Sequence, residues 1–230
     1  MLISETRKFI YIAVPKTGST SVEAQLMALD PQIRRNKVPR PDGTWITVHK
    51  HATAAEIRRH MGENMNDYTV IAFIRSPIST VVSKYYHYRL GRGAERARQL
   101  SFSRRAVGLQ LRVLSTFLLP LHIWTLLYPY SKTHEFLLGG DGEILVDEIG
   151  DFSKLQEDFN MIFGNLGFDA KELALPMTNK SKYSSKRHED DALLRRIVRW
   201  KSRIDVGIFK NHSVSANAAS KHSVGADWDG

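Results

Sequence analysis

Apolar and polar positions first form a clear pattern near the start of the chain. The apolar run Phe9–Val14 is typical of a buried strand, and Pro15 ends it. Residues 22–29 then carry apolar side chains at helical spacing, and the hydroxyl residues before them are typical helix caps. The segment therefore predicts a strand, a loop and a helix. The loop consists of Lys16, Thr17, Gly18, Ser19, Thr20 and Ser21.

The same order occurs a second time after a connection rich in proline and arginine. The apolar run Tyr68–Ile74 predicts another buried strand, and the polar turn Arg75-Ser76-Pro77 follows it. Residues 78–90 then have helical spacing. Strands that alternate with helices are typical of an α/β fold with a parallel sheet.

The remaining patterns complete a single domain over residues 1–210. Thr53 and Glu56 have the spacing of a capping box, which predicts the start of a short helix. Residues 211–230 are small and polar, which predicts a flexible C-terminal tail. The other elements predicted are a strand over 143–146 and helices over 53–61, 152–166 and 190–204.

The first polar loop has the chemistry of an anion site. A helix that begins after a buried strand offers free backbone N–H groups and the positive end of its dipole. Gly18 allows the backbone to pass close to a phosphate, the hydroxyl residues add donors, and Lys16 adds a charge. The common nucleotide-triphosphate pattern, with lysine after a second glycine, is absent.

The second polar turn changes the expected ligand. Its strand ends in Arg75, and no later predicted strand ends in an acid that could hold magnesium. Two basic sites without a metal acid suit a nucleotide that carries phosphates at two separate places. The sequence thus favours such a nucleotide, with no metal required.

Both motifs resemble those of the sulfotransferases that use 3′-phosphoadenosine 5′-phosphosulfate (PAPS). VPKTGSTSVEAQL resembles the family's 5′-phosphosulfate loop, which implies cofactor contacts from Pro15 and the six loop residues after it. VIAFIRSPISTVVSKYYHY resembles the 3′-phosphate motif, in which Arg75 and Ser83 bind the 3′-phosphate.

The resemblance extends over about residues 8–210 and is greatest for the carbohydrate and bacterial branch of the family. It implies a P-loop-like three-layer α/β fold, with a central parallel sheet flanked by helices. Residues 134–168 and 202–209 resemble two further segments of that branch. LPMTNKS resembles a stretch that closes over the nucleotide through Asn179, Lys180 and Ser181. Departures occur at Ser153, where the family often has Glu, and near Lys210, where it ends on Tyr; they bear on local packing or acceptor contacts.

The implied reaction moves a sulfuryl group from PAPS to an acceptor hydroxyl and leaves 3′-phosphoadenosine 5′-phosphate (PAP). Lys16 would neutralise the charge on the bridging oxygen of the leaving phosphate. An alcohol acceptor needs a base, and histidine titrates in the right range. By the resemblance, His51 is the first candidate and His49 the second. The alternatives are a capping role for His51, a surface role for His49, and a metal pair that lacks a third ligand.

Polar residues after the second turn are weaker candidates for the site. His87 faces either the core or the acceptor, whereas His122 and His134 lie in apolar surroundings typical of core histidines. Lys84 and Arg89 are candidates for 3′-phosphate or acceptor binding. Tyr85, Tyr86 and Tyr88 are predicted to be packing residues.

Composition and charge indicate that the partners of the protein are anionic. The chain has 42% hydrophobic residues, no cysteine and a net charge of +9, and the absence of cysteine fits a cytoplasmic protein. Residues 75–112 contain nine Lys/Arg and one acid. The basic segment 89–112 suggests an acidic glycan, PAPS or an anionic membrane surface, and no nucleic-acid module accompanies it. The apolar stretch 113–130 is broken by Pro120, which favours a buried helix pair or an acceptor-site wall over a membrane span.

The acceptor itself is not specified by these patterns. Residues 31–48 and 91–135 are the variable segments that would build its pocket. The resemblance favours a carbohydrate or glycolipid, with a small metabolite or a peptide tyrosine as alternatives. Two hypotheses of other classes are a metabolite kinase with a degenerate loop and a nucleotide- or polyanion-binding protein without catalysis.

Overall fold

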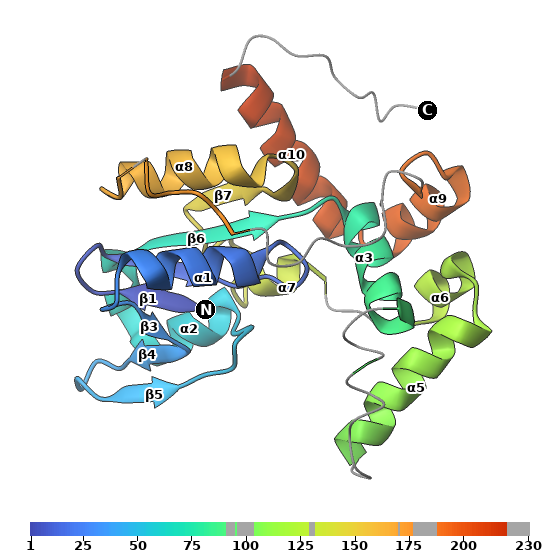
Figure 1. Ribbon diagram of the computed structural model, residues 1–230, viewed down its shortest axis with the longest axis horizontal. Helices are drawn as coiled ribbons and strands as arrows, with labels where there is room; N and C mark the ends of the chain where they lie inside the picture. The colour runs from blue at the N-terminus through green and yellow to red at the C-terminus, as the bar shows by residue number, and fades with distance from the viewer. Residues whose placement is uncertain (91–94, 96–103, 129–131, 170, 177–187, 220–230) are drawn as a thin grey trace.

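A five-stranded sheet forms the centre of the structure, a computed structural model that describes residues 1–90, 95, 104–128, 132–169, 171–176 and 188–219. The strand order is β3-β1-β2-β6-β7 (Figure 1). The strands are β1 (Leu2–Ser4), β2 (Phe9–Ile12), β3 (Arg34–Arg35), β6 (Thr69–Ile74) and β7 (Glu148–Asp151). A separate hairpin consists of β4 (Lys37–Pro39) and β5 (Trp45–Thr47).

Strands β2, β6 and β7 run parallel, as the alternation of strands and helices predicts. Ile12 lies opposite Ala72, and Ile74 lies opposite Asp151, so all three strands end at the same edge of the sheet. Strands β1 and β3, which the apolar pattern does not predict, extend the other side of the sheet in antiparallel fashion. The edge at which the parallel strands end is where the two polar turns must meet.

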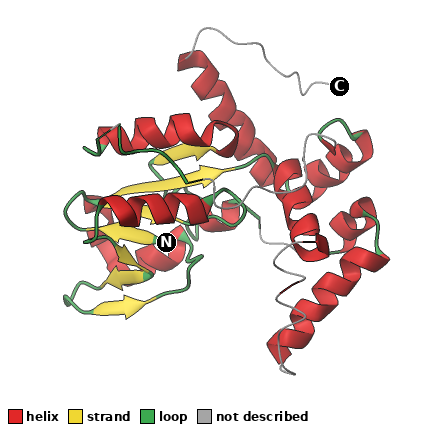
Figure 2. Cartoon of the chain, viewed as in Figure 1, coloured by secondary structure: helices red, strands yellow, loops and turns green. Residues whose placement is uncertain are grey.

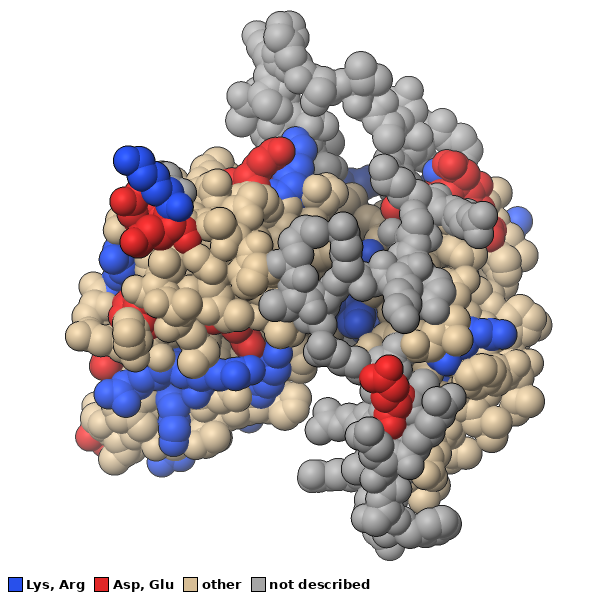
Figure 3. Space-filling view, viewed as in Figure 1, with Lys and Arg blue, Asp and Glu red and all other residues tan. Residues whose placement is uncertain are grey.

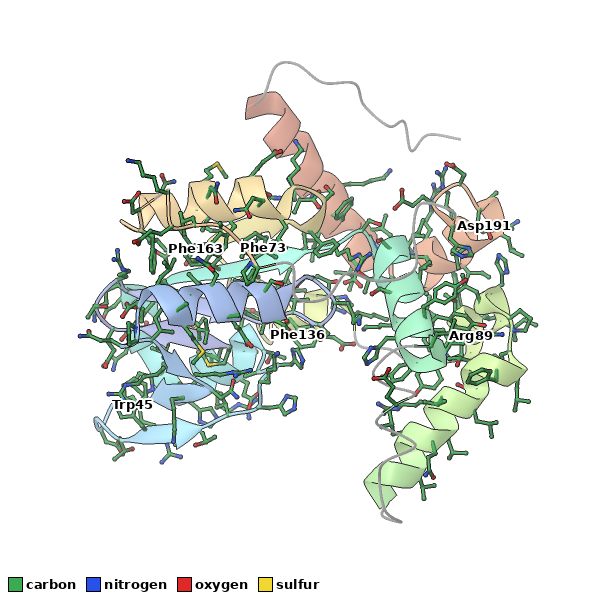
Figure 4. The ribbon with its side chains drawn as sticks, viewed as in Figure 1. Trp45, Phe73, Arg89, Phe136, Phe163 and Asp191 are labelled. Carbon is green, nitrogen blue, oxygen red and sulfur yellow. The ribbon has the colours of Figure 1, made fainter. Side chains whose placement is uncertain are left out.

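The strands alternate their side chains between two apolar layers. Phe9 and Tyr11 pack on one face under α1 (Ser19–Leu29) and α8 (Leu155–Asn165). Ile10 and Ile12 pack on the other face against α2 (Ala54–Met61) and α7 (His134–Leu137). Figure 2 shows helices on both sides of the sheet, and Figure 4 shows the labelled Phe163 and Phe136 belonging to different layers. The predicted three-layer α/β fold is confirmed.

A second group of helices packs beside the sheet rather than on it. This helical lobe consists of α3 (Pro77–Leu90), α5 (Arg104–Leu118), α6 (Leu121–Leu127) and α9 (Ala192–Lys201). Its core is the fully buried Trp124, which stacks on Tyr128 and lies edge-on to Tyr85. The packing role predicted for Tyr85 is therefore confirmed.

Three predicted elements differ from the structure. The strand predicted over 143–146 is wrong: only Ile144 forms an isolated bridge, to Leu138, and the strand that joins β6 starts at Glu148. The Asp147 carboxylate accepts a hydrogen bond from the Val70 N–H at 2.7 Å, which sets the start of that pairing.

The helix predicted over 152–166 begins instead with a 3-10 turn, η2 (Phe152–Lys154), because the Asp151 carboxylate caps the Ser153 N–H at 2.7 Å. The last predicted helix divides at Ser202 into α9 and α10 (Arg203–Ala219). Helix α10 continues into the segment predicted to be a tail, and residues 220–230 lie outside the described residues.

The long apolar stretch is only half buried. Pro120 divides it into the end of α5 and α6, as its position predicts. Leu121 and Trp124 are buried, whereas Leu118 is 69% exposed, so the predicted buried helix pair is buried on one side only. The alternative of an acceptor-site wall stays a prediction. None of the described helices is long and apolar enough to cross a membrane.

Candidate functional site

The two polar turns of the sequence meet at the carboxyl ends of β2 and β6. The Nη1 of Arg75, the residue after β6, donates a hydrogen bond to the backbone carbonyl of Lys16 at 3.2 Å. This contact joins the two motifs that the sequence resemblance assigns to different phosphates. A ligand with two anionic groups would therefore find the residues of both turns next to each other.

The first turn is held in an unusual backbone conformation. Lys16 has φ 73° and Gly18 has φ 75°, both in the left-handed region. Between them, the buried Thr17 donates its hydroxyl to the Val14 carbonyl at 2.9 Å. The Thr17 hydroxyl thus shapes the loop from within.

Helix α1 starts directly from this turn. The prediction that one of the hydroxyl residues 19–21 caps this helix is wrong, because the N-cap is Gly18 and no side chain caps the helix. The Ser21 N–H donates to the Gly18 carbonyl at 2.9 Å. Among the described residues, the N–H groups of Ser19 and Thr20 have no backbone or side-chain acceptor, so they are available to an anion at the helix start.

Gly18 is required for a reason that the sequence does not show. A Cβ at this position would lie 2.7 Å from Cδ2 of Leu155 and 3.2 Å from Cε2 of Phe152. Its positive φ also disfavours any other residue. Gly18 therefore lets α8 approach the loop closely, in addition to its expected role of admitting a phosphate.

Arg75 is held by three neighbours. Its Nε donates to Oγ of the buried Ser79 at 2.7 Å, and its guanidinium carbon lies 4.4 Å from the centre of the Phe152 ring. Burial lowers the pKa of Arg75 to about 10, and Glu189 partly opposes this, so the group stays charged at neutral pH. Within the described part of the chain, no carboxylate is in ion-pair contact with it, which leaves its charge for an anionic ligand.

Ser79 and Phe152 are site residues that the sequence analysis misses. Ser79 lies four residues after Arg75, one helical turn away, and this spacing is the signal that could have found it. The predicted phosphate ligand Ser83 lies one further turn along α3 on the same helix face and is half-buried. Its role stays a prediction.

Lys84 adds a third cation beside the loop. It is only 8% exposed, and burial lowers its pKa to about 8. The carboxylates of Glu135 and Asp205 act to raise this pKa, and the charge of Lys16 acts to lower it. Lys84 therefore lies within electrostatic range of both the loop lysine and the acids of α7 and α10.

His51 is attached to the same loop. Its Nδ1 lies 2.5 Å from the carbonyl of Ala13, and a carbonyl can only accept, so Nδ1 carries the proton. Burial lowers the pKa of His51, against the opposing effect of the Ala13 hydrogen bond, and nearby Lys50 lowers it further. His51 is consequently a neutral imidazole with its Nε2 lone pair free of that bond.

His49 has a different environment. It is exposed, and its Nδ1 accepts a hydrogen bond from the His51 N–H at 3.1 Å. Helix α2 is capped by Thr53, whose hydroxyl accepts from the Glu56 N–H at 3.1 Å, as predicted. The alternative of a capping role for His51 is not what the structure shows.

A buried carboxylate anchors the histidine segment, which the sequence analysis does not foresee. Glu23 of α1 accepts from Nζ of Lys50 and from Nη2 of Arg35, both at 3.1 Å, and its side chain is 3% exposed. Since Lys50 lies between the two histidines, this pair ties them to the helix that starts at the loop.

A family model described as the sulfotransferase family matches residues 1–108. Residues 1–108 belong to the sulfotransferase family. The matched segment contains the loop, the histidine pair and the Arg75 turn, and the match supports a transferase of sulfuryl groups. No curated protein and no solved structure matches the chain significantly.

Two histidines of the second half of the chain, His122 and His134, have carboxylate partners, as predicted for satisfied residues. His122 Nε2 lies 2.7 Å from Asp191, and His134 Nδ1 lies 2.8 Å from Asp205. Asp205 also accepts the backbone N–H of His134 at 2.7 Å, so this acid caps α7 and joins it to α10. His87 is half-buried on α3, and its interpretation stays open.

Arg89 lies in the helical lobe, where it contacts α5. Its Nη1 donates to the Tyr85 hydroxyl at 2.7 Å and to the Thr116 carbonyl, and its guanidinium lies over Phe117. Figure 4 shows it beside α3 and α5. Nη1 of Arg89 thus holds α5, and the suggestion that Arg89 aids 3′-phosphate or acceptor binding stays a prediction.

Two further predictions concern the cofactor side. Asn179, Lys180 and Ser181 lie outside the described residues. Within the described ranges, no group of three His, Cys, Asp or Glu could hold a metal ion. One acid does end a parallel strand, contrary to the sequence expectation: Asp151, whose carboxylate caps Ser153.

Proposed function

We propose that this sulfotransferase uses PAPS as its donor and transfers the sulfuryl group to an acceptor hydroxyl. The observation that carries the proposal is the contact between Arg75 and the Lys16 carbonyl. It makes one basic surface from two turns, and PAPS has phosphate groups at its 5′ and 3′ positions to match them. The free N–H groups at the start of α1 add to the same surface.

The chain's own groups supply charge and position. As the acceptor oxygen bonds to sulfur, the bond from sulfur to the bridging oxygen breaks, and PAP leaves with the added negative charge. The Lys16 ammonium and the loop N–H groups stabilise that charge. Arg75, held by Ser79 and the Phe152 ring, fixes the 3′-phosphate and so orients the nucleotide.

His51 is the proposed base. Its proton sits on Nδ1 because of the Ala13 carbonyl, so Nε2 can accept the acceptor's proton. Its lowered pKa keeps it unprotonated at neutral pH. His49 ranks second because its Nδ1 is already used by the His51 N–H.

The proposed acceptor is a carbohydrate or glycolipid hydroxyl. Lys84 supports an anionic acceptor, because it brings a buried positive charge close to Lys16 on the side of α7 and α10. A sulfated or carboxylated sugar would supply the matching charge.

Binding and turnover test the proposal separately. PAP should raise the melting temperature, and Lys16→Ala or Arg75→Ala should reduce that shift. His51→Ala should keep the shift and lose transfer from PAPS in a screen of hydroxylated acceptors. Stabilisation by ATP with magnesium but not by PAP would instead support a kinase. PAP binding without transfer to any acceptor would support a binding protein.

A further inference from the structure

Exposed apolar side chains are concentrated at one end of the molecule. Fifteen large hydrophobic residues are exposed in the described part of the chain, and Met27, Ile144 and Met161 are the three outside the helical lobe and the first turn of α10. The other twelve are Leu90, Val107, Leu111, Leu114, Phe117, Leu118, Ile123, Leu126, Leu127, Leu193, Trp200 and Ile204. A contiguous exposed apolar surface of this kind marks an interaction site.

Helix α5 presents its apolar stripe outward. Leu111, Leu114 and Leu118 have the spacing of one helix face and are 59%, 50% and 69% exposed. The inner side of the same helix carries Thr116, which is fully buried and whose carbonyl bonds to Tyr85. A surface helix that serves only its own core has the reverse arrangement, so the outer stripe requires a separate explanation.

Helices α6 and α9 continue this outer surface and are fixed to each other. Nζ of Lys201 in α9 donates to the carbonyls of Thr125, Leu126 and Tyr128 at 2.7, 2.8 and 2.7 Å. Trp200, the preceding residue, is 69% exposed. Figure 1 shows α5, α6 and α9 on the side of α3 away from the sheet, so their outer sides form one end of the molecule.

The charge of these three helices has a single sign. They contain no Asp or Glu, whereas they contain Arg104, Arg105, Arg112, Arg195, Arg196, Arg199 and Lys201. Arg112, Arg196 and Arg199 are exposed. In Figure 3, tan surface with blue patches covers the right-hand edge over α5 and α6. The surface is therefore apolar and cationic together.

We propose that the outer face of α5, α6 and α9 binds the surface of an anionic lipid bilayer. Aliphatic side chains and a tryptophan enter the boundary between headgroups and acyl chains, and arginines pair with the headgroups. A second copy of the chain fits less well, because two cationic faces would meet. A nucleic acid would match the charge but would leave the leucines in water.

This inference goes beyond the proposed function and does not need it. Binding to lipid requires neither PAPS nor an acceptor. It places the enzyme at a membrane surface by peripheral contact, which agrees with the lack of a membrane-spanning helix among the described residues.

Vesicle flotation with the full chain tests the proposal. The protein should float with vesicles of phosphatidylcholine and phosphatidylglycerol, should stay behind with phosphatidylcholine alone, and should bind less in high salt. The triple variant Leu111→Ser, Leu114→Ser and Leu118→Ser, and the double variant Arg112→Glu and Arg196→Glu, should each lower the partition coefficient by roughly tenfold or more.

The matched control replaces exposed apolar residues at the other end of the molecule. Met27→Ser with Met161→Ser should leave vesicle binding unchanged, since these side chains are 38% and 58% exposed on α1 and α8. Circular dichroism and the thermal unfolding midpoint report whether each variant is folded.

Three results would overturn the proposal. The first is no binding of the folded wild type to anionic vesicles at low salt. The second is equal loss of binding in the lobe variants and the methionine control. The third is a wild-type dimer in sedimentation velocity that the leucine variant dissociates, with no vesicle binding, which would assign the face to a second copy.

Discussion

Replacement of Arg75 tests whether the two phosphate motifs act together, because Arg75 bonds to the Lys16 carbonyl of the first motif. In the structure its Nε is bonded to Ser79 and one Nη1 hydrogen to the Lys16 carbonyl, so the remaining guanidinium N–H groups are available to a phosphate. Arg75→Ala removes that charged contact and also the link that holds the Lys16 turn. Arg75→Lys keeps the charge but cannot make both links at once.

The expected loss of PAP affinity follows from the number of charged hydrogen bonds that Arg75 makes to the phosphate. One such bond contributes roughly 1.5–3 kcal/mol, which corresponds to a loss of roughly 10- to 150-fold in PAP affinity. Arg75 is half-buried and makes neutral contacts within the protein, so the unfolding free energy should fall by only about 1 kcal/mol. Arg75→Lys should lie between alanine and wild type in PAP affinity.

Isothermal titration of PAP measures this effect directly. Arg59→Ala, an exposed arginine on α2, is the control for the change in net charge and should bind PAP like the wild type. If Arg75→Ala is folded and its Kd for PAP stays within threefold of wild type (about 0.65 kcal/mol), the assignment of Arg75 to a phosphate is refuted.

Three further predictions concern catalysis, pH and packing. His51→Ala should lower kcat by roughly 100-fold or more with unchanged PAP affinity, whereas His49→Ala should have a smaller effect. Because the lowered pKa of His51 lies below 6.5, turnover should be retained at neutral pH and fall only as pH drops through that lowered value; an acid limb at or above 6.5 contradicts the assignment. The KM for an anionic acceptor should rise as pH increases through about 8, because Lys84 then loses its charge, and Lys84→Met should raise this KM and remove the pH step. Gly150→Ala should lower the unfolding free energy by about 1–3 kcal/mol, since its Cβ would lie 2.2 Å from the Phe73 ring; denaturant titration measures this, and an unchanged midpoint contradicts the packing.

The sequence predicts the part of the fold in which local pattern and burial agree. The runs that became β2 and β6 are apolar throughout because both faces of these strands are covered, and each is followed by a turn and a helix. Strand β7 was misplaced because its sequence, Glu148 to Asp151, has no apolar run, and its position depends on pairing with β6. Strand β1 was missed because three residues give too short a pattern.

The site shows the same division. The loop, Arg75 and the histidine pair can be found from sequence because each lies in a short local motif. Phe152 and Glu23 reach the site only through tertiary contacts, so no local pattern marks them. Ser79 is different, because its spacing of four residues from Arg75 is a local signal. The contact of Arg89 with α5 could not be predicted for a similar reason, since its charge is visible in the sequence but its partners on α5 are not.

The outer face of the lobe was predicted only in part. The basic segment suggested a membrane surface, whereas the apolar stretch suggested a buried pair. Periodicity alone cannot tell which side of α5 faces its own protein. The structure shows the leucines outside, which brings the two observations together on one surface.

Product analysis with PAPS tests the central claim most directly. The protein is incubated with PAPS and a set of hydroxylated acceptors, without added metal, beside the Lys16→Ala and His51→Ala variants. The account predicts PAP and an acceptor with a sulfate-sized gain in mass for the wild type, and strongly reduced product for both variants. Formation of the same product by the folded Lys16→Ala variant at the wild-type rate would contradict it.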